Sequence, residues 1–390
     1  MPDRYDAIVI GLGGMGSATA FHLARRGRRV LALEQYEMLH ERGSSHGHSR
    51  IIRLAYHEHP DYVPLLRRSY ELWHELEAVA AERLLVTTGS VEGGPEDGPT
   101  FRGALHAAEL HAIPHEVLDA PELRRRHPAY AGFDELTRVV WQPDGGFLLA
   151  ERTIQAHVNG ALAAGADLRF GTRVAGWEPT ADGGVRVRHD GGTAEADRLV
   201  ICAGPWARTL VPRLARLAVP ERQVVAWLRP IAPDLFAPER FPVFLIDVAE
   251  GSYYGFPTYE GHGFKFGWYH HFREPIDPDD PDRSCRPDDE AALRAFAERY
   301  FPDGAGKTEA LKACIFTNSP DEHFILDQLP DAPQVSVAAG FSGHGYKFCS
   351  VVGEVMADLA TDGITRHEIG FLRLSRFDAA SVGGRVAADL

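Results

Sequence analysis

The first forty residues restrict the fold of this chain more than any other segment. Residues 5–36 read YDAIVIGLGGMGSATAFHLARRGRRVLALEQY. An apolar run enters a glycine-rich turn, an amphipathic stretch with the periodicity of a helix follows, and a second short apolar run ends in an acid. This pattern predicts a strand, a helix and a parallel strand, a βαβ unit of about thirty residues that is typical of nucleotide-binding sheets.

The turn carries the spacing GxGxxG at Gly11, Gly13 and Gly16, with Gly14 and Met15 between them. Glycines at these places allow a tight turn, a close approach to a pyrophosphate at the helix N-terminus, and close packing of helix on strand. Glu34 ends the second strand, where a carboxylate accepts hydrogen bonds from an unphosphorylated ribose. We therefore expect a dinucleotide at this turn, although the motif does not separate FAD from NAD.

Bulk composition favours small-molecule chemistry. The chain has 390 residues, 44% of them apolar, and a net charge of −14, so we expect two domains and weak attraction for nucleic acid. No apolar run approaches a membrane span, and the acidic start MPDRYD is unlike a signal peptide, which predicts a cytoplasmic protein. The four cysteines form no CxxC pair, which argues against a disulfide framework or a zinc site.

Later segments predict two interleaved domains in an α/β fold, α+β overall. Helical patterns cover 62–83 and 151–165, and the apolar strand RLVICAG at 198–204 and the strand in QVSVAAGFSGHGYKF near the end belong with the nucleotide-binding sheet. Residues 88–147 are rich in glycine, proline and turns, and 222–316 contain alternating strands. We expect a Rossmann-like domain from 1–85, 148–220 and 322–390, and a second domain, on a mixed or antiparallel sheet, from 86–147 and 221–321.

Two arginines stand out in GSSHGHSRIIR at 43–53. Arg50 and Arg53 are separated by two isoleucines, so in a local helix they would share one face. Two fixed guanidiniums can hold a carboxylate or balance an electron-rich ring, whereas the alternative is a pair of surface arginines in ordinary ion pairs. The nearby histidines match no tetrahedral ligand spacing, and we expect no metal.

Several further side chains have roles that depend on what they face. Alternation in FKF places Lys265 opposite its two phenylalanines, where it faces either solvent or a cavity. The same ambiguity holds for Tyr254, His270 and Lys347. Because the helix dipole favours anions at a helix start, we expect an anion to compensate the charge of Lys347 there. By its pattern alone, Cys314 is a small buried core residue.

Six stretches together resemble one family along nearly the whole chain. They are GLGGMGSA, GSSHGHSRIIRLAY, YVPLLRRSYELW, YYGFP, KACIFTNSPDEHFILD and AAGFSGHGYKF. In this order they are similar to the monomeric sarcosine oxidase and N-methyl-L-tryptophan oxidase family, flavin enzymes with a D-amino-acid-oxidase type of fold. The spellings NSPDEHFILDQLP and FLRLSRF resemble the N-methyltryptophan branch more closely.

The resemblance implies a role for each matching residue. It implies FAD bound covalently through an 8α-S-cysteinyl bond at Cys314, and a substrate carboxylate held by Arg53 and Lys347. It implies that Lys265 lies on the face of the flavin where oxygen reacts, and that Tyr254 and His270 line the substrate site. The remaining cofactor positions that it implies are Glu34 and Val174 at the adenosine half, and Ser44, His46, Arg50, Gly343 and Gly345 near the flavin.

Three departures from the family pattern bear on the site. The usual SHHGD is replaced by Ser45, His46, Gly47 and His48 followed by serine, and Phe316 stands where tyrosine is usual. One extra residue after Lys265, in KFGWYHHF, makes His271 a rival to His270.

The activity that the resemblance implies is oxidation of N-methylated amino acids. Hydride transfer to FAD, reoxidation by dioxygen to hydrogen peroxide, and hydrolysis of the imine to an amino acid and formaldehyde would follow. Sarcosine and N-methyl-L-tryptophan are the favoured substrates, and a monomer without nucleic-acid or membrane partners is expected. The alternatives are a flavin oxidase or dehydrogenase of a cyclic or biosynthetic imino acid, and a non-catalytic flavin-binding scaffold.

Overall fold

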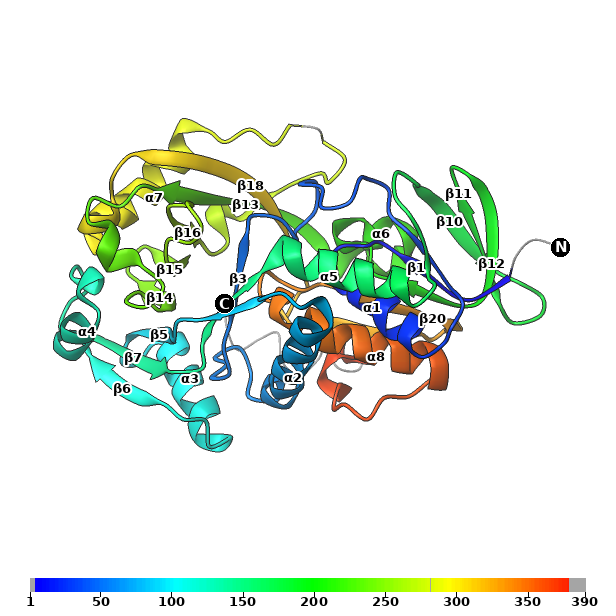
Figure 1. The fold of residues 1–390 in the computed structure, drawn as a ribbon, viewed down its shortest axis with the longest axis horizontal. Helices are drawn as coiled ribbons and strands as arrows, with labels where there is room; N and C mark the ends of the chain where they lie inside the picture. The colour runs from blue at the N-terminus through cyan, green and yellow to red at the C-terminus, as the bar shows by residue number, and fades with distance from the viewer. Residues whose placement is uncertain (1–3, 281, 379–390) are drawn as a thin grey trace.

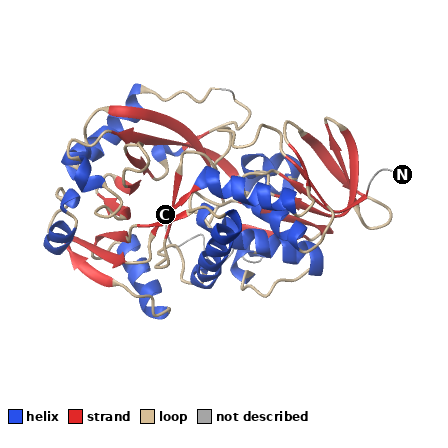
Figure 2. Ribbon diagram, in the orientation of Figure 1, coloured by secondary structure: helices blue, strands red, loops and turns tan. Residues whose placement is uncertain are grey.

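A computed structural model describes residues 4–280 and 282–378 of the chain. Its helices and strands form three sheets with helices packed on them (Figures 1 and 2). The fold class is therefore the predicted mixed α/β arrangement.

The first sheet is built on the predicted βαβ unit. β1 (Arg4–Ile10) pairs in parallel with β2 (Val30–Leu33) on one side and with β12 (Gly192–Ile201) on the other. Its central residues are inaccessible to solvent, as expected for a strand covered on both faces. The sheet has eight strands, and the others are β9 (Asp167–Arg169), β10 (Val174–Pro179), β11 (Val185–His189), β19 (Ile325–Leu329) and β20 (Ala332–Ala339).

Four helices gather beside this sheet. α1 (Gly14–Arg25) packs between α5 (Ala150–Ala163) and α8 (Cys349–Asp362), and α2 (Tyr62–Ala80) packs on α8 and α5 (Figure 1). A side chain at Gly353 would meet the main chain of Ala18, so the absence of a Cβ there permits the close approach of α1 and α8. The two predicted helices at 62–83 and 151–165 and the C-terminal amphipathic helix are confirmed.

The second sheet has nine strands and an aromatic core. Its order is β17-β13-β16-β15-β14-β5-β7-β6, with β18 paired to β13. Stacked phenylalanines, among them Phe244, Phe264 and Phe301, fill the space beneath it. The strands are β5 (Ser90–Pro95), β6 (Glu116–Asp119), β7 (Thr137–Gln142), β13 (Val219–Leu228), β14 (Val243–Val248), β15 (Gly251–Phe256), β16 (Phe264–Trp268), β17 (Glu274–Pro275) and β18 (Thr308–Asn318).

The segment 88–147, read from its sequence as mostly glycine, proline and turns, is more regular than that. It supplies β5, β6 and β7 to the nine-stranded sheet, together with α3 (Pro99–Leu110) and α4 (Ala120–Arg126). All but the last residue of β5 are buried, and three of its six residues are glycine or proline, so period-two alternation is missing there. The remaining helices are α6 (Ala207–Leu210) and α7 (Pro287–Tyr300).

A small third sheet corrects the local prediction for the two arginines. β3 (Ser49–Ile52), β8 (Gly146–Leu149) and β4 (Leu85–Thr87) form it in that order. Arg50 therefore lies on an extended strand that ends before Arg53, and the two do not share a helix face. The two isoleucines between them favour the strand, because β-branched side chains pack well on a pleated surface.

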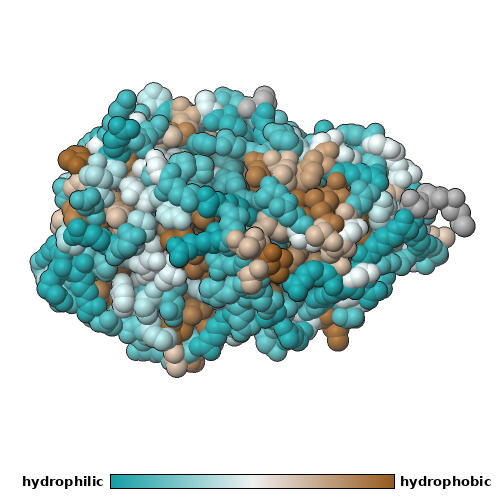
Figure 3. All heavy atoms as spheres, in the orientation of Figure 1, coloured by the Kyte–Doolittle hydropathy of each residue, from teal (hydrophilic) through white to brown (hydrophobic). Residues whose placement is uncertain are grey.

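Hydrophilic residues cover most of the face drawn in Figure 3, and hydrophobic residues form smaller patches between them. Among the described residues, no helix combines the length and the apolar character that crossing a bilayer requires.

Candidate active site

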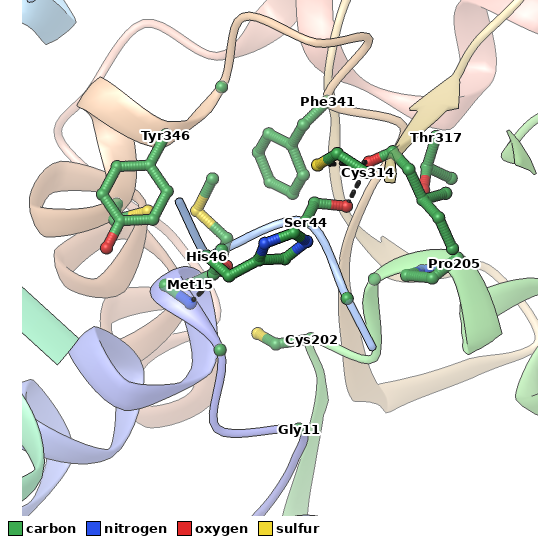
Figure 4. A pocket seen from close by; sticks show the side chains of 18 of the residues that line it. Gly11, Met15, Ser44, His46, Cys202, Pro205, Cys314, Thr317, Phe341 and Tyr346 are labelled. Atoms are coloured by element: carbon green, nitrogen blue, oxygen red, sulfur yellow. Dashed lines mark hydrogen bonds between the residues drawn. The ribbon is translucent and has the colours of Figure 1, made fainter. Parts of the chain in front are cut away.

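A long cavity runs from the glycine turn of the first sheet to the face of the nine-stranded sheet. It collects most of the side chains singled out in the sequence, from segments that are far apart in the chain. The predicted residues that line it are Gly11, Gly13, Gly14, Met15, Glu34, Ser44, His46, Arg50, Arg53, Val174, Tyr254, Lys265, Cys314, Gly343, Gly345 and Lys347. Figure 4 shows part of this wall.

The glycine turn has the geometry that its spacing predicts. Gly11 has φ +91°, a left-handed conformation that favours glycine, and a Cβ at Gly16 would overlap the carbonyl oxygen of Gly11. Gly16 thus serves the packing of α1 on β1, and it is not among the cavity-lining residues of the described chain. The main-chain nitrogen of Leu12 donates to Glu34 Oε2 at 2.8 Å, so the carboxylate at the end of β2 is fixed beside the turn.

His46 and Cys314 meet in the middle of the cavity. Figure 4 shows the His46 ring near the side chains of Ser44 and Cys314. His46 is 3% exposed, and neither ring nitrogen has a hydrogen-bond partner among the described residues. Burial raises the pKa of the Cys314 thiol, but His46 and the Arg50 guanidinium outweigh it and lower the pKa to about 7. At neutral pH a large fraction of this thiol is therefore the nucleophilic thiolate.

Arg50 holds the segment that carries His46. Its Nη2 donates to the carbonyl oxygen of Ser44 at 2.7 Å and also to that of His46, and its guanidinium lies over the Tyr346 ring. Arg50 is thus a cavity cation rather than one member of a surface ion pair.

Lys265 faces the cavity and not solvent, the two alternatives that the alternation of its strand left open. Nζ donates to the carbonyl oxygens of Gly47 and Ser49 at 2.7 and 2.8 Å. The side chain is 3% exposed. Burial and the nearby Arg50 lower the pKa of Lys265 well below that of a free lysine. Phe264 and Phe266 point to the opposite, fully buried side, as alternation predicts.

Arg53 and Lys347 meet at the ring of Tyr56. The guanidinium carbon of Arg53 lies 4.5 Å from the ring centroid, and Lys347 Nζ lies 5.1 Å from it. Arg53 Nη2 donates to Glu58 at 2.8 Å. Lys347 Nζ donates to the carbonyl oxygen of His344 at 2.6 Å. Two cations from segments almost 300 residues apart thus converge on one end of the cavity.

The surroundings of Lys347 and Glu58 shift the pKa values of both side chains. Burial and the charge of Arg53 lower the pKa of Lys347 to about 7. Burial favours protonation of Glu58, but Arg53, His57, His344 and Lys347 outweigh it and hold the pKa of this carboxyl well below its usual range. Sequence reasoning did not single out Glu58, because a glutamate beside two histidines carries no local signal of burial.

The structure corrects the prediction for the substrate-site histidine. Neither His270 nor His271 is among the residues that line the described cavity, and the aromatic residue there is Tyr269. His270 lies between Glu221 and Glu322, with Nδ1 2.7 Å from Glu221 Oε1. His271 is buried against Asp289. Tyr269 packs against Phe316 and donates from its hydroxyl to the carbonyl oxygen of Ser342.

Tyr254 lies where the sequence placed it. Its side chain lines the cavity beside Lys265 and Phe256. Burial raises the pKa of the Tyr254 hydroxyl well above its usual range, so this group is a neutral hydrogen-bond donor. Within the described residues, no cluster of histidine, cysteine, aspartate or glutamate could hold a metal ion.

Comparison with known proteins gives one consistent family. Residues 6–359 match the family model DAO, FAD dependent oxidoreductase. A monomeric sarcosine oxidase from Streptomyces avermitilis is 43% identical over 97% of this chain and 100% of its own. An N-methyl-L-tryptophan oxidase from Yersinia pestis is 32% identical over 96% of this chain and 99% of its own. The solved structure of NikD, an unusual amino acid oxidase essential for nikkomycin biosynthesis, superposes with a TM-score of 0.83 at 27% identity, covering 95% of this chain and 97% of that one.

Proposed function

The chain belongs to the FAD-dependent oxidoreductase family, and on that premise we propose that it is an oxidase of N-methylated amino acids. The observation that carries the proposal is the convergence of Arg53 and Lys347 at one end of a cavity that also holds Cys314 and Lys265. A scaffold that only bound a flavin would have no need of a cationic pair for a substrate acid.

The residues present fit FAD. The glycine turn and Glu34 suit a pyrophosphate and an unphosphorylated ribose. His46 is buried in the cavity wall, and neither of its ring nitrogens has a hydrogen-bond partner in the described part of the chain, as expected of a side chain whose partner is a ligand. We propose that Cys314 binds the flavin covalently, since its depressed pKa provides the thiolate that bond formation requires.

Arg53 and Lys347 would bind the substrate carboxylate. Their fixed charges would orient the secondary amine and its N-methyl group toward the middle of the cavity, which turns a bimolecular encounter into an oriented one. Tyr254 and Tyr269 would close the wall around the substrate and exclude water. FAD would supply the redox chemistry, a two-electron oxidation of the N-methyl amine with dioxygen as the final acceptor and hydrogen peroxide as its product, and hydrolysis of the resulting imine would give the amino acid and formaldehyde.

Lys265 would stabilise the negative charge that develops as oxygen is reduced. Its Nζ donates to two carbonyl oxygens in a buried position, so the amino group needs no reorganisation to act. This role belongs to a different half-reaction from the one that Arg53 and Lys347 serve.

The boundaries of the two domains are also part of the proposal. We assign 1–85, 148–220 and 322–390 to FAD binding, and 86–147 and 221–321 to substrate binding, because strands from the two latter segments share one sheet. Within these ranges, residues 1–3, 281 and 379–390 lie outside the described structure. The relatives named monomeric sarcosine oxidase support a monomer. Their higher identity to this chain also favours sarcosine over N-methyl-L-tryptophan as the substrate.

An anaerobic reduction screen tests the function. Purified protein is mixed with sarcosine, N-methyl-L-tryptophan, other N-methyl amino acids, L-proline and a six-membered cyclic imino acid, and the flavin absorbance is followed. We expect bleaching by N-methyl amino acids, and one peroxide and one formaldehyde per turnover in air. Bleaching by the cyclic substrates alone, or turnover without peroxide, would instead support the imino-acid oxidase or dehydrogenase alternative.

A further inference from the structure

A carboxylate lies behind the cavity, where nothing in the proposed reaction uses it. Glu92, on β5, is 0% exposed, and the described cavity lining does not include it. Its Oε2 lies 2.6 Å from Arg53 Nε and 3.2 Å from His57 Nδ1. Its Oε1 accepts a hydrogen bond from Gln142 Nε2 at 3.3 Å. A buried carboxylate is costly unless it is paired, so Glu92 and Arg53 form one unit.

The two carboxylates that contact Arg53 occupy different sides of it. Glu58 lines the cavity and contacts Nη2, an outer donor of the guanidinium. Glu92 Oε2 lies 2.6 Å from Nε, the donor nearest the backbone, as an ion pair without hydrogen-bond geometry. Of the two, Glu58 lines the cavity, where it would compete with an incoming substrate acid, whereas Glu92 pairs with the guanidinium from outside the described lining.

Gln142 connects this support to the main chain. Its Oε1 accepts hydrogen bonds from the backbone nitrogens of Leu54 and Ala55, both at 2.9 Å, immediately after Arg53. Its Nε2 donates to Glu92. The backbone after the arginine and the carboxylate behind it are therefore held by the same amide.

We propose that Glu92 is a positioning residue for the carboxylate anchor, orienting the Arg53 guanidinium so that its outer donors face the cavity. The inference rests on the proposed role of Arg53 in binding the substrate acid. A planar guanidinium binds a carboxylate well only in a defined orientation, and an arginine free to rotate would have to be ordered on each binding event.

The test compares two substitutions that remove the same charge. Glu92→Gln keeps the side-chain length and one oxygen that can turn toward Arg53 Nε, whereas Glu92→Val removes every polar atom of the side chain. Both holoenzymes are titrated with methoxyacetate, an unreactive ether analogue of sarcosine, and binding is read from the flavin spectrum. Glu96→Val, at an exposed glutamate just after the same strand, is the control.

We expect Glu92→Gln to bind methoxyacetate within about threefold of the wild type, and Glu92→Val to bind at least about tenfold more weakly. In turnover of sarcosine, Glu92→Val should raise KM by a similar factor and leave kcat within about threefold, a split that general destabilisation would not produce. Equal binding by the Gln and Val variants would overturn the proposal.

A replacement variant and a check on the wild type complete the test. If Glu92→Val does not fold, Glu92→Asn replaces it, because an amide one methylene shorter does not reach Nε; Asn and Gln variants of equal affinity would also overturn the proposal. If the wild type itself neither binds methoxyacetate nor is reduced by N-methyl amino acids, the proposed function fails rather than the role of Glu92 alone.

Discussion

Lys265 and Gly47 join the two sides of the cavity: Nζ of the lysine, on the nine-stranded sheet, donates to the carbonyl oxygen of the glycine at 2.7 Å. Gly47 has φ +97°, and its nitrogen donates to Glu151 Oε1 at 2.7 Å. The ammonium is therefore fixed in place by a turn that is itself fixed.

Replacing Lys265 should separate the two half-reactions. In Lys265→Met we expect anaerobic reduction by sarcosine within about threefold of the wild type, but reoxidation by oxygen slower by about 100-fold, since a preorganised cation is lost from the site of charge development. Stopped-flow measurement of each half-reaction checks this, with the exposed Lys307→Met as the control. Equal losses in both half-reactions would contradict the assigned role.

Replacing Cys314 should abolish covalent flavin. Cys314→Ser removes the thiol of lowered pKa, and a serine hydroxyl does not ionise at neutral pH. We expect the yellow colour to stay in the supernatant after acid precipitation of the variant and in the pellet for Cys285→Ser, a partly exposed thiol away from the cavity lining. Colour retained in the Cys314→Ser pellet would place the attachment elsewhere.

Binding of an acid should weaken as Lys347 loses its proton. Because burial and Arg53 lower the pKa of Lys347 to about 7, its charge is present at pH 6 and is lost above pH 7. We expect the Kd of methoxyacetate to rise between pH 7 and 9 by at most about tenfold per unit, the limit for one proton. Lys347→Met should bind weakly at pH 6 and show a flat profile; a steep profile in this variant would assign the titration to another group.

His270 should contribute to stability in a defined pH range. Burial lowers the pKa of His270, but Glu221 and Glu322 outweigh it and raise the pKa to about 9. A folded-state pKa above the unfolded value gives stability that is fully present below about pH 6.5 and is lost as pH rises through about 9. Glu322 is half exposed, so screening keeps the effect small.

The test compares the melting temperature of the wild type with that of His270→Asn. We expect the wild type to have a Tm higher by about 2–4 °C at pH 6, and the difference to vanish by pH 10. A difference that grows with pH would show that the ring is held neutral rather than charged.

Strong local patterns made most of the fold predictable. The βαβ unit, the strand at 198–204 and the C-terminal helix each carry a periodicity that burial on one or both faces requires. Alternation also placed Lys265 opposite its phenylalanines, although only the tertiary fold decided which face meets the cavity. No local pattern indicates roles for Arg53, Cys314 and Lys347. The expectations for these three residues came from the family resemblance.

The features that the sequence did not predict depend on the register of strands and on charges that lie far apart in the chain. Tyr269 lines the cavity, whereas His270 and His271, which follow it directly, are not among the described lining residues. Glu92 is buried and Glu58 is 15% exposed, and both pair with Arg53. The pairing of Glu92, which comes from a distant strand, leaves no trace in a single sequence. The assumed helix at Arg50 failed because a third, three-stranded sheet pairs with that segment.

The cavity lining comes from two different sheets: Glu34 directly follows a strand of one, and Cys314 lies within a strand of the other. A prosthetic group bound to both would couple the unfolding of the two cores. Loaded protein would then lose both in a single transition, whereas flavin-free protein would be free to melt in two steps. Cooperativity of denaturation would thus be a property of the complex rather than of the polypeptide alone.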